Sequence, residues 1–265
     1  MSIPRAITFV VATYGADDVL NRNFLSSPGL VEAHGHQILI QRDYASAAKA
    51  YNDAIDHADN DLMVFAHNDM IFPEPWLDQL EQAITFLDGT DPAWGVLGCC
   101  GVAHDGSFHV WAYHPTQGLL GKPFDLPVPV QTLDEIILIF RKRSGLRFDE
   151  NLPYFHLYGT DICMRAAKQG MKNYAIPAYC IHNASYHPVL PKEFYRNYRY
   201  IRKTWKADLP IHTSCQLITK QEFPLYRRRM HEIYLKLSGK KLVTIPRVTD
   251  TANLVKQATA AREAL

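Results

Sequence analysis

The chain has 265 residues, 47% of them hydrophobic and 21% charged, and a net charge of +1, which is the composition of a folded protein with a sizeable core. No apolar run reaches the roughly 18 residues that a membrane span needs, and the start lacks the pattern of a signal peptide. The five cysteines form no C-x-x-C pair, which excludes a disulfide framework and favours a reducing cytoplasm.

Short apolar runs bounded by turn residues recur along the chain. They cover Ala6–Ala12, Gln37–Ile40, Asp61–Ala66, Trp94–Gly98, Glu135–Phe140 and Tyr174–Tyr179. Because these runs are continuous rather than alternating, they predict strands buried on both faces, as in parallel sheets.

Helical spacing of apolar residues lies between these runs. Two helices are predicted after Asp43 and after Pro75, and Thr160 is predicted to cap a third, which Gly170 ends. Strands that alternate with helices over the first 100 residues predict right-handed βαβ units and an α/β fold.

The character of the sequence changes near Lys192. The segment 192–241 holds 13 Lys and Arg against 4 Asp and Glu, whereas the rest of the chain holds 15 against 23. Two basic amphipathic helices are predicted here, followed by a C-terminal segment that is a helix or a frayed end. Charge runs are usually solvated faces, but this one also suits an anionic membrane surface, and its interleaved aromatics leave nucleic acid open as a partner.

The run "DLMVFAHND" leads a predicted buried strand into His67 and Asp69. Ligands of open α/β sheets bind beyond the carboxyl ends of strands, and residues two apart in extended chain point the same way. A carboxylate beside an imidazole suits a divalent ion, Mg²⁺ or Mn²⁺, with the imidazole favouring Mn²⁺. The alternative is that Asp69 caps a turn and His67 is a histidine at the edge of the core.

Two long segments resemble family 2-like glycosyltransferases with the GT-A fold. "ATYG" and "YASAAKAYNDAIDHADNDLMVFAHNDMIFPEPWLDQL" are similar to the nucleotide-sugar half, in which a strand ends in D-x-D or, in one branch, in H-x-D, here "HND". "VQTLDEIILIFRKRSGLRFDENLPYFHLYGTDICMRAAKQGMKNYAIPAYCIHN" is similar to the acceptor half. The resemblance covers residues 6–190 and implies a mixed, mostly parallel sheet flanked by helices.

The resemblance implies roles for residues around the donor. Asp69 is implied as a ligand of the metal that bridges the donor diphosphate, with His67 and His182 as further ligands and His187 in reserve. Four other residues of the donor half are expected to bind the nucleotide, namely Thr13, Tyr14, Asp43 and Asn68. Taken alone, Thr13 and Tyr14 also fit an ordinary turn, and Asp43 fits a helix cap.

The same resemblance implies an acceptor pocket near Asp134, Glu135 and His156. Asp161 is the candidate general base that takes the proton of the acceptor hydroxyl. In many members of the family the base lies six residues before the helix arginine. Arg165 is that arginine here and the position holds Gly159, which leaves the base and the stereochemistry open.

These features predict a metal-dependent glycosyltransferase that moves a sugar from a nucleotide-sugar donor to the hydroxyl of a saccharide or lipid-linked acceptor, in surface polysaccharide or glycolipid synthesis. Residues 1–190 are expected to form the catalytic domain, with a donor half to residue 100 and an acceptor half after it. Residues 191–265 are expected to form a helical basic extension, which suits a cytoplasmic protein at the inner membrane face. An inactive sugar- or nucleotide-binding relative and a metal-dependent phosphoester hydrolase are the alternatives.

Overall fold

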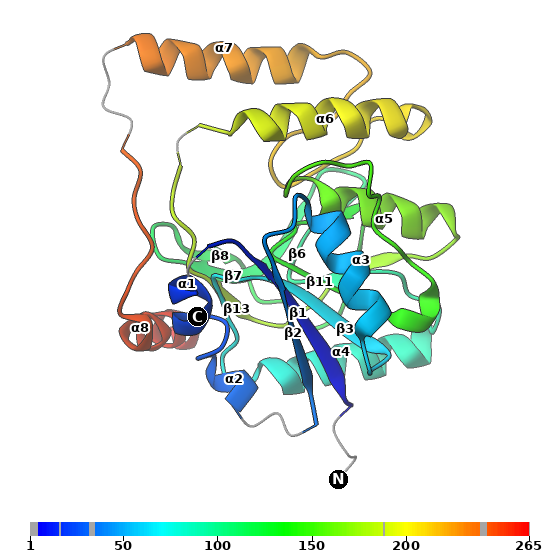
Figure 1. Cartoon of the computed structure of the whole chain (residues 1–265), viewed down its shortest axis with the longest axis vertical. Coiled ribbons are helices and arrows are strands. Elements are labelled where there is room, and N and C mark those ends of the chain that lie inside the picture. The colour runs from blue at the N-terminus through cyan, green and yellow to red at the C-terminus, as the bar shows by residue number, and fades with distance from the viewer. Residues whose placement is uncertain (1–4, 16, 32–34, 188, 239–242, 265) are drawn as a thin grey trace.

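Figure 1 shows a computed structural model of the chain, which describes residues 5–15, 17–31, 35–187, 189–238 and 243–264. The strands are β1 (Ile7–Thr13), β2 (Gln37–Arg42), β3 (Leu62–His67), β4 (Met70–Ile71), β5 (Leu97–Gly98), β6 (Cys100–Val102), β7 (Phe108–His114), β8 (Gly118–Gly121), β9 (Val128–Val130), β10 (Thr132–Leu133), β11 (Ile137–Arg141), β12 (Asn173–Ala175) and β13 (Cys180–His182). The α-helices are α1 (Asp18–Arg22), α2 (Pro28–Val31), α3 (Ala47–His57), α4 (Trp76–Thr90), α5 (Tyr158–Lys168), α6 (Lys192–Thr204), α7 (Phe223–Leu237) and α8 (Thr251–Glu263).

The larger sheet has the strand order β2-β1-β3-β11-β5-β12-β9, and the smaller has the order β10-β6-β7-β13-β4, with β8 paired to β7. The predicted α/β class with flanking helices is confirmed. In the larger sheet β1 pairs in parallel with both β2 and β3, but β11 runs antiparallel to β3 and β5. The sheet is therefore mixed, as predicted, but less parallel than expected, because β11 is entered directly from β10 rather than through a crossover helix.

The continuous apolar runs bury both faces of the larger sheet. On one face Val10, Phe65 and Phe140 pack in a core with α3, α5 and α6. On the other face Phe9 and Val64 pack with α4. Alternate residues of one strand thus pack against helices on opposite faces of the sheet. This explains why polar residues do not alternate with apolar ones along these runs.

Helix α5 begins three residues earlier than predicted. Thr160 lies buried inside its first turn, and the residue that precedes the helix is Leu157, which has left-handed backbone angles. The N–H of Leu157 donates to the carboxylate of Glu135. The start of α5 is therefore fixed by a carboxylate from the loop before β11, and the predicted Thr160 cap is wrong.

The C-terminal part forms three helices with different surroundings. In Figure 1, α6 and α7 lie at one end of the molecule, whereas α8 lies on the smaller sheet. Leu254 and Ala258 of α8 pack against Trp111 and Ile181. Trp111 is thus a core residue, and the predicted domain boundary near residue 190 stays a prediction.

Across the described ranges, none of the helices combines the length and apolar character required to cross a bilayer. Residues 239–241, the end of the predicted basic segment, lie outside the described residues.

Candidate metal and donor site

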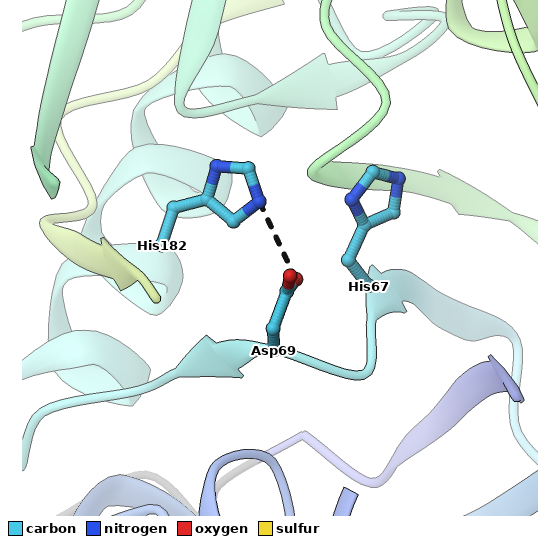
Figure 2. Close-up of side chains that lie close together, drawn as sticks. All are labelled: His67, Asp69 and His182. Atoms are coloured by element: carbon cyan, nitrogen blue, oxygen red, sulfur yellow. Dashed lines mark ion pairs between the residues drawn. The ribbon is translucent and has the colours of Figure 1, made fainter. Parts of the chain in front are cut away.

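Three side chains meet where β3, β4 and β13 come together. His67 is the last residue of β3, Asp69 lies in the turn before β4, and His182 is the last residue of β13. The antiparallel pair of β4 and β13 sets His182 opposite Met70, next to Asp69. One ligand atom of each residue lies within 4.8 Å of the others, and Figure 2 shows both rings directed to the same side of Asp69.

The two oxygens of Asp69 have different neighbours. The side chain is buried, with 3% of the residue exposed. His182 Nε2 lies 3.3 Å from Oδ1 and forms an ion pair with it when the ring is protonated, but without hydrogen-bond geometry, so Oδ1 accepts no hydrogen bond from the described residues. Buried polar atoms rarely stay unpaired, and an oxygen faced by two imidazoles fits a divalent cation with mixed nitrogen and oxygen ligands.

The other oxygen of Asp69 is bound by an arginine that the sequence did not predict. Arg247 donates to Oδ2 through Nε at 3.0 Å and Nη2 at 2.8 Å. Arg247 belongs to residues 243–250, here called the C-terminal strap. Asn183 fixes the strap, because its side chain donates to the carbonyl oxygen of Val248 and accepts from the Val248 N–H. An isolated arginine in "TIPRVTD" has no spacing or motif that would have pointed to this site.

Electrostatics keep Asp69 ionised. Burial opposes ionisation, but His182, His67 and Arg247 together hold the pKa of Asp69 well below its ordinary value. Burial lowers the pKa of His67 despite the nearby Asp69 charge. Burial also opposes the charged form of His182, but Asp69 outweighs it and raises the pKa of that ring. A carboxylate anion and a neutral His67 imidazole are the forms that bind metals.

His67 is held in place by its second contact. Its Nε2 atom lies 3.0 Å from the hydroxyl of Tyr158, at the start of α5. A fixed ring nitrogen orients the other one, which is how hydrogen bonds to histidine prepare a metal ligand. This contact also joins the donor half of the sheet to the helix of the predicted acceptor half.

The predicted nucleotide residues gather at the carboxyl ends of β1, β2 and β3. Asn68 Nδ2 donates to Thr13 Oγ1 at 3.2 Å, and the Asp43 N–H donates to the carbonyl oxygen of Thr13 at 3.1 Å. Tyr14 is 82% exposed and Asp43 is also exposed, so both side chains are open to a ligand. Asp43 has a φ of 59°, a conformation that asparagine and aspartate tolerate better than most residues.

The predicted acceptor residues lie beside His67 because of the antiparallel β11. The His67 N–H donates to the carbonyl oxygen of Ile136 at 3.2 Å, so the acids before β11 reach the end of β3. Asp134 adds to the negative potential that raises the pKa of His182. Burial and the neighbouring Asp134 raise the pKa of Glu135 to about 8. His156 packs against Phe194 of α6, and burial lowers its pKa.

Asp161 is fully occupied by structural partners. Its Oδ2 accepts from Arg165 Nε at 2.6 Å and its Oδ1 from Trp205 Nε1 at 2.8 Å. Burial raises the pKa of Asp161 although both partners oppose that change. These contacts tie α5 to α6, and Asp161 does not join the three side chains of the metal site. His187 is exposed and lies outside that group as well.

No protein-family profile matches the chain. A curated relative, ATP synthase subunits region ORF 6 from Fuscovulum blasticum, is 28% identical over 125 residues, which cover 45% of this chain. The match spans 50% of the length of that relative.

Similar solved structures include a mannosyltransferase. It is PcManGT from Pyrobaculum calidifontis in complex with GDP-Man and Mn²⁺, with a TM-score of 0.47 and 16% identity over 99% of this chain and 75% of that one. TarS from S. aureus has a TM-score of 0.46 and 15% identity over 75% of this chain and 39% of that one. A TarS fragment in complex with UDP-GlcNAc has a TM-score of 0.47 at 14% identity, over 75% of this chain and 66% of that one.

Proposed function

We propose that this protein is a metal-dependent glycosyltransferase, family 2-like and of the GT-A type, that moves a hexose or related sugar from a nucleotide-sugar donor to an acceptor hydroxyl. The observation that carries the proposal is the buried Asp69 carboxylate, which lies beside the rings of His67 and His182 and whose Oδ1 atom accepts no hydrogen bond from the described residues. The site lies beyond the carboxyl end of β3, where open α/β sheets bind their ligands.

Asp69, His67 and His182 would hold the divalent ion, Mn²⁺ or Mg²⁺, in the H-x-D arrangement inferred from the sequence. When bound, the ion supplies positive charge to the diphosphate leaving group. The exposed Tyr14 and Asp43 and the linked Thr13 and Asn68 would bind and orient the nucleotide.

Glu135 replaces Asp161 as the proposed general base. One Glu135 oxygen is bound by the Leu157 N–H, while Oε2 accepts no hydrogen bond from the described residues. A Cβ atom at Gly159 would lie 2.8 Å from the Leu133 carbonyl oxygen and 3.3 Å from Glu135 Cγ, so Glu135 fills the space next to the position expected for the base. As the acceptor oxygen bonds to the anomeric carbon and the diphosphate leaves, the hydroxyl proton passes to the ionised form of Glu135. The raised pKa makes that form a stronger base but the minor one at neutral pH, so transfer should increase as pH rises toward 8.

The acceptor side and the location belong to the same proposal. Asp134 and His156, whose charges act on His67, would bind the acceptor, which is a saccharide or a lipid-linked saccharide of a surface polysaccharide or glycolipid. The cytoplasmic location rests on the five cysteines of the sequence, which include no C-x-x-C pair.

The test is a thermal-shift screen of nucleoside diphosphates and nucleotide sugars with and without Mn²⁺, followed by an assay for release of nucleoside diphosphate. A ligand that binds the native state raises the melting temperature by mass action. Asp69→Asn should abolish the Mn²⁺-dependent shift and the release, whereas Asp78→Asn, an exposed acid on α4, should retain both. A wild type that no nucleotide or nucleotide sugar stabilises would contradict the proposal.

A non-catalytic sugar- or nucleotide-binding protein is the second candidate, favoured by the missing acid at Gly159 and by the occupied Asp161. It predicts a Mn²⁺-dependent shift with no product from any donor. Release of inorganic phosphate from nucleotides would instead indicate a phosphoester hydrolase.

A further inference from the structure

The outward face of α7 exposes apolar side chains along its whole length. Phe223 is 68% exposed and Leu237 is 81% exposed, and the residues between them on this face are Tyr226, Met230, Ile233 and Tyr234, all exposed. A contiguous exposed apolar stripe is unusual in a soluble surface and marks an interaction site.

The stripe is a property of the helix and not of scattered residues. Its members recur at intervals of three and four, which places them on an arc about 100° wide. The opposite face is anchored, because Leu225 is buried and Glu232 accepts from the Tyr195 hydroxyl of α6 at 2.6 Å. The orientation of α7 is therefore set by α6, which leaves the apolar stripe facing outward.

Basic residues border the stripe on both sides. On a helical projection Arg227 lies on one flank, and Arg229 and Lys236 lie on the other, all exposed. The second flank opens into a groove of about 340 Å³ between α6 and α7, which is also lined by Lys192, Arg196 and Arg199. Glu232 is the carboxylate in this lining, and Tyr195 and the Leu190 N–H already bind it.

We propose that α7 docks onto an anionic phospholipid bilayer, with its apolar stripe inserted at the interface and its basic flanks on the lipid phosphates. Apolar and basic residues arranged in this way are typical of helices that lie in the membrane plane. Figure 1 shows α7 at the outermost end of the molecule, with α6 between it and the rest of the fold, so a flat surface can reach it.

Charge separates this partner from a second copy of the chain. Two copies that met through this face would bring Arg227, Arg229 and Lys236 of each close to those of the other, and like charges repel. An anionic surface neutralises them instead. The inference goes beyond sugar transfer and does not depend on it.

The experiment is cosedimentation of the full chain with vesicles of equal parts phosphatidylglycerol and phosphatidylcholine, and with vesicles of phosphatidylcholine alone. The wild type should bind the anionic vesicles, and binding should weaken at high salt. The triple variant Tyr226→Ser, Met230→Ser, Leu237→Ser should lose about tenfold or more in binding, because each side chain leaves water on insertion. Phe108→Ser on β7, also exposed, is the matched control and should bind as the wild type does.

Charge reversal tests the flanks separately. Arg227→Glu and Lys236→Glu should each weaken binding to the anionic vesicles by about fivefold or more. All these positions are exposed, so thermal melts should stay unchanged, and the nucleotide-dependent shift should persist in every variant.

Equal binding of the wild type and the triple variant would overturn the inference, as would the absence of wild-type binding. A concentration-dependent dimer that the triple variant abolishes, without vesicle binding, would assign the stripe to a second copy instead. Light scattering after gel filtration measures this outcome.

Discussion

At Asp69 one carboxylate oxygen is bound by Arg247, and the other pairs with His182 without a hydrogen bond. A buried carboxylate with no positive partner would be costly, so Arg247 provides the countercharge that the ion-free fold requires. A divalent ion at the second oxygen would provide a second one. The two positive partners therefore share one carboxylate, and each weakens the attraction for the other.

Replacing this arginine separates its two effects. Arg247→Ala should lower the free energy of unfolding without metal by about 1–3 kcal/mol, because the partly exposed pair loses two charged hydrogen bonds to a buried oxygen. The same variant should bind Mn²⁺ more tightly. Calorimetric titration and denaturant melts measure both effects, with Arg22→Ala on α1 as the surface control. Unchanged Mn²⁺ affinity would show that Arg247 does not compete.

Glu135 should make stability depend on pH. Its pKa rises from 4.5 to about 8 on folding, so between these pH values the native state keeps a proton that the unfolded chain has released. The free energy of unfolding should therefore fall as pH rises through this window. Glu135→Gln should remove about 2–4 kcal/mol of this decline, whereas the exposed Glu74→Gln should not. Parallel pH profiles for wild type and Glu135→Gln would contradict the assignment.

The sequence predicted His67, Asp69 and His182 as one group, and the structure brings them together, although their metal role stays a prediction. The strand end predicted His67 and Asp69, whereas His182 was implied by the family resemblance and belongs to the other sheet. Arg247 was missed because its contact joins residues that are 178 positions apart through a segment without regular structure. Such pairings leave no local pattern in a single sequence.

At the scale of elements, the antiparallel β11 is the feature that assembles the site. It carries Asp134 and Glu135 to the end of β3, and Glu135 in turn fixes the start of α5. Six of the strands (β1, β2, β3, β5, β11 and β12) and the longer helices were predicted from apolar runs and periodicity, but the shorter strands and the helices α1 and α2 were not. The direction of β11 and the first turn of α5 were not, because they depend on which elements become neighbours.

The close approach of α5 to this loop gives a prediction. Gly159→Ala should destabilise the fold by about 1–3 kcal/mol, because the added Cβ would lie 2.8 Å from the Leu133 carbonyl oxygen. It should also reduce sugar transfer by displacing Glu135. Gly89→Ala in α4 is the matched control, since its Cβ would meet no atom within 4 Å, and it should be neutral or stabilising. Similar melts for both variants would contradict this packing.

At the scale of the whole molecule, α8 anchors the C-terminal strap. Leu254→Ser should weaken the docking of α8 by about 2–4 kcal/mol, because Leu254 is buried against the smaller sheet. Residues 243–250 should then be cleaved faster in limited proteolysis, whereas the exposed Gln257→Ser should behave as the wild type. Equal cleavage rates would show that α8 does not hold the strap.

The strap also joins the two ends of the molecule, since it lies between α7 and α8 and carries Arg247. Coupling between two binding events is reciprocal in free energy. If a cation loosens Arg247 from Asp69, a partner that binds and restrains the strap changes the cation affinity. The cation in turn changes the affinity of that partner by the same factor. Loading of the site with its ion is in this sense a competition between two positive charges for one carboxylate, and the midpoint of loading depends on the strap as well as on the three ligands.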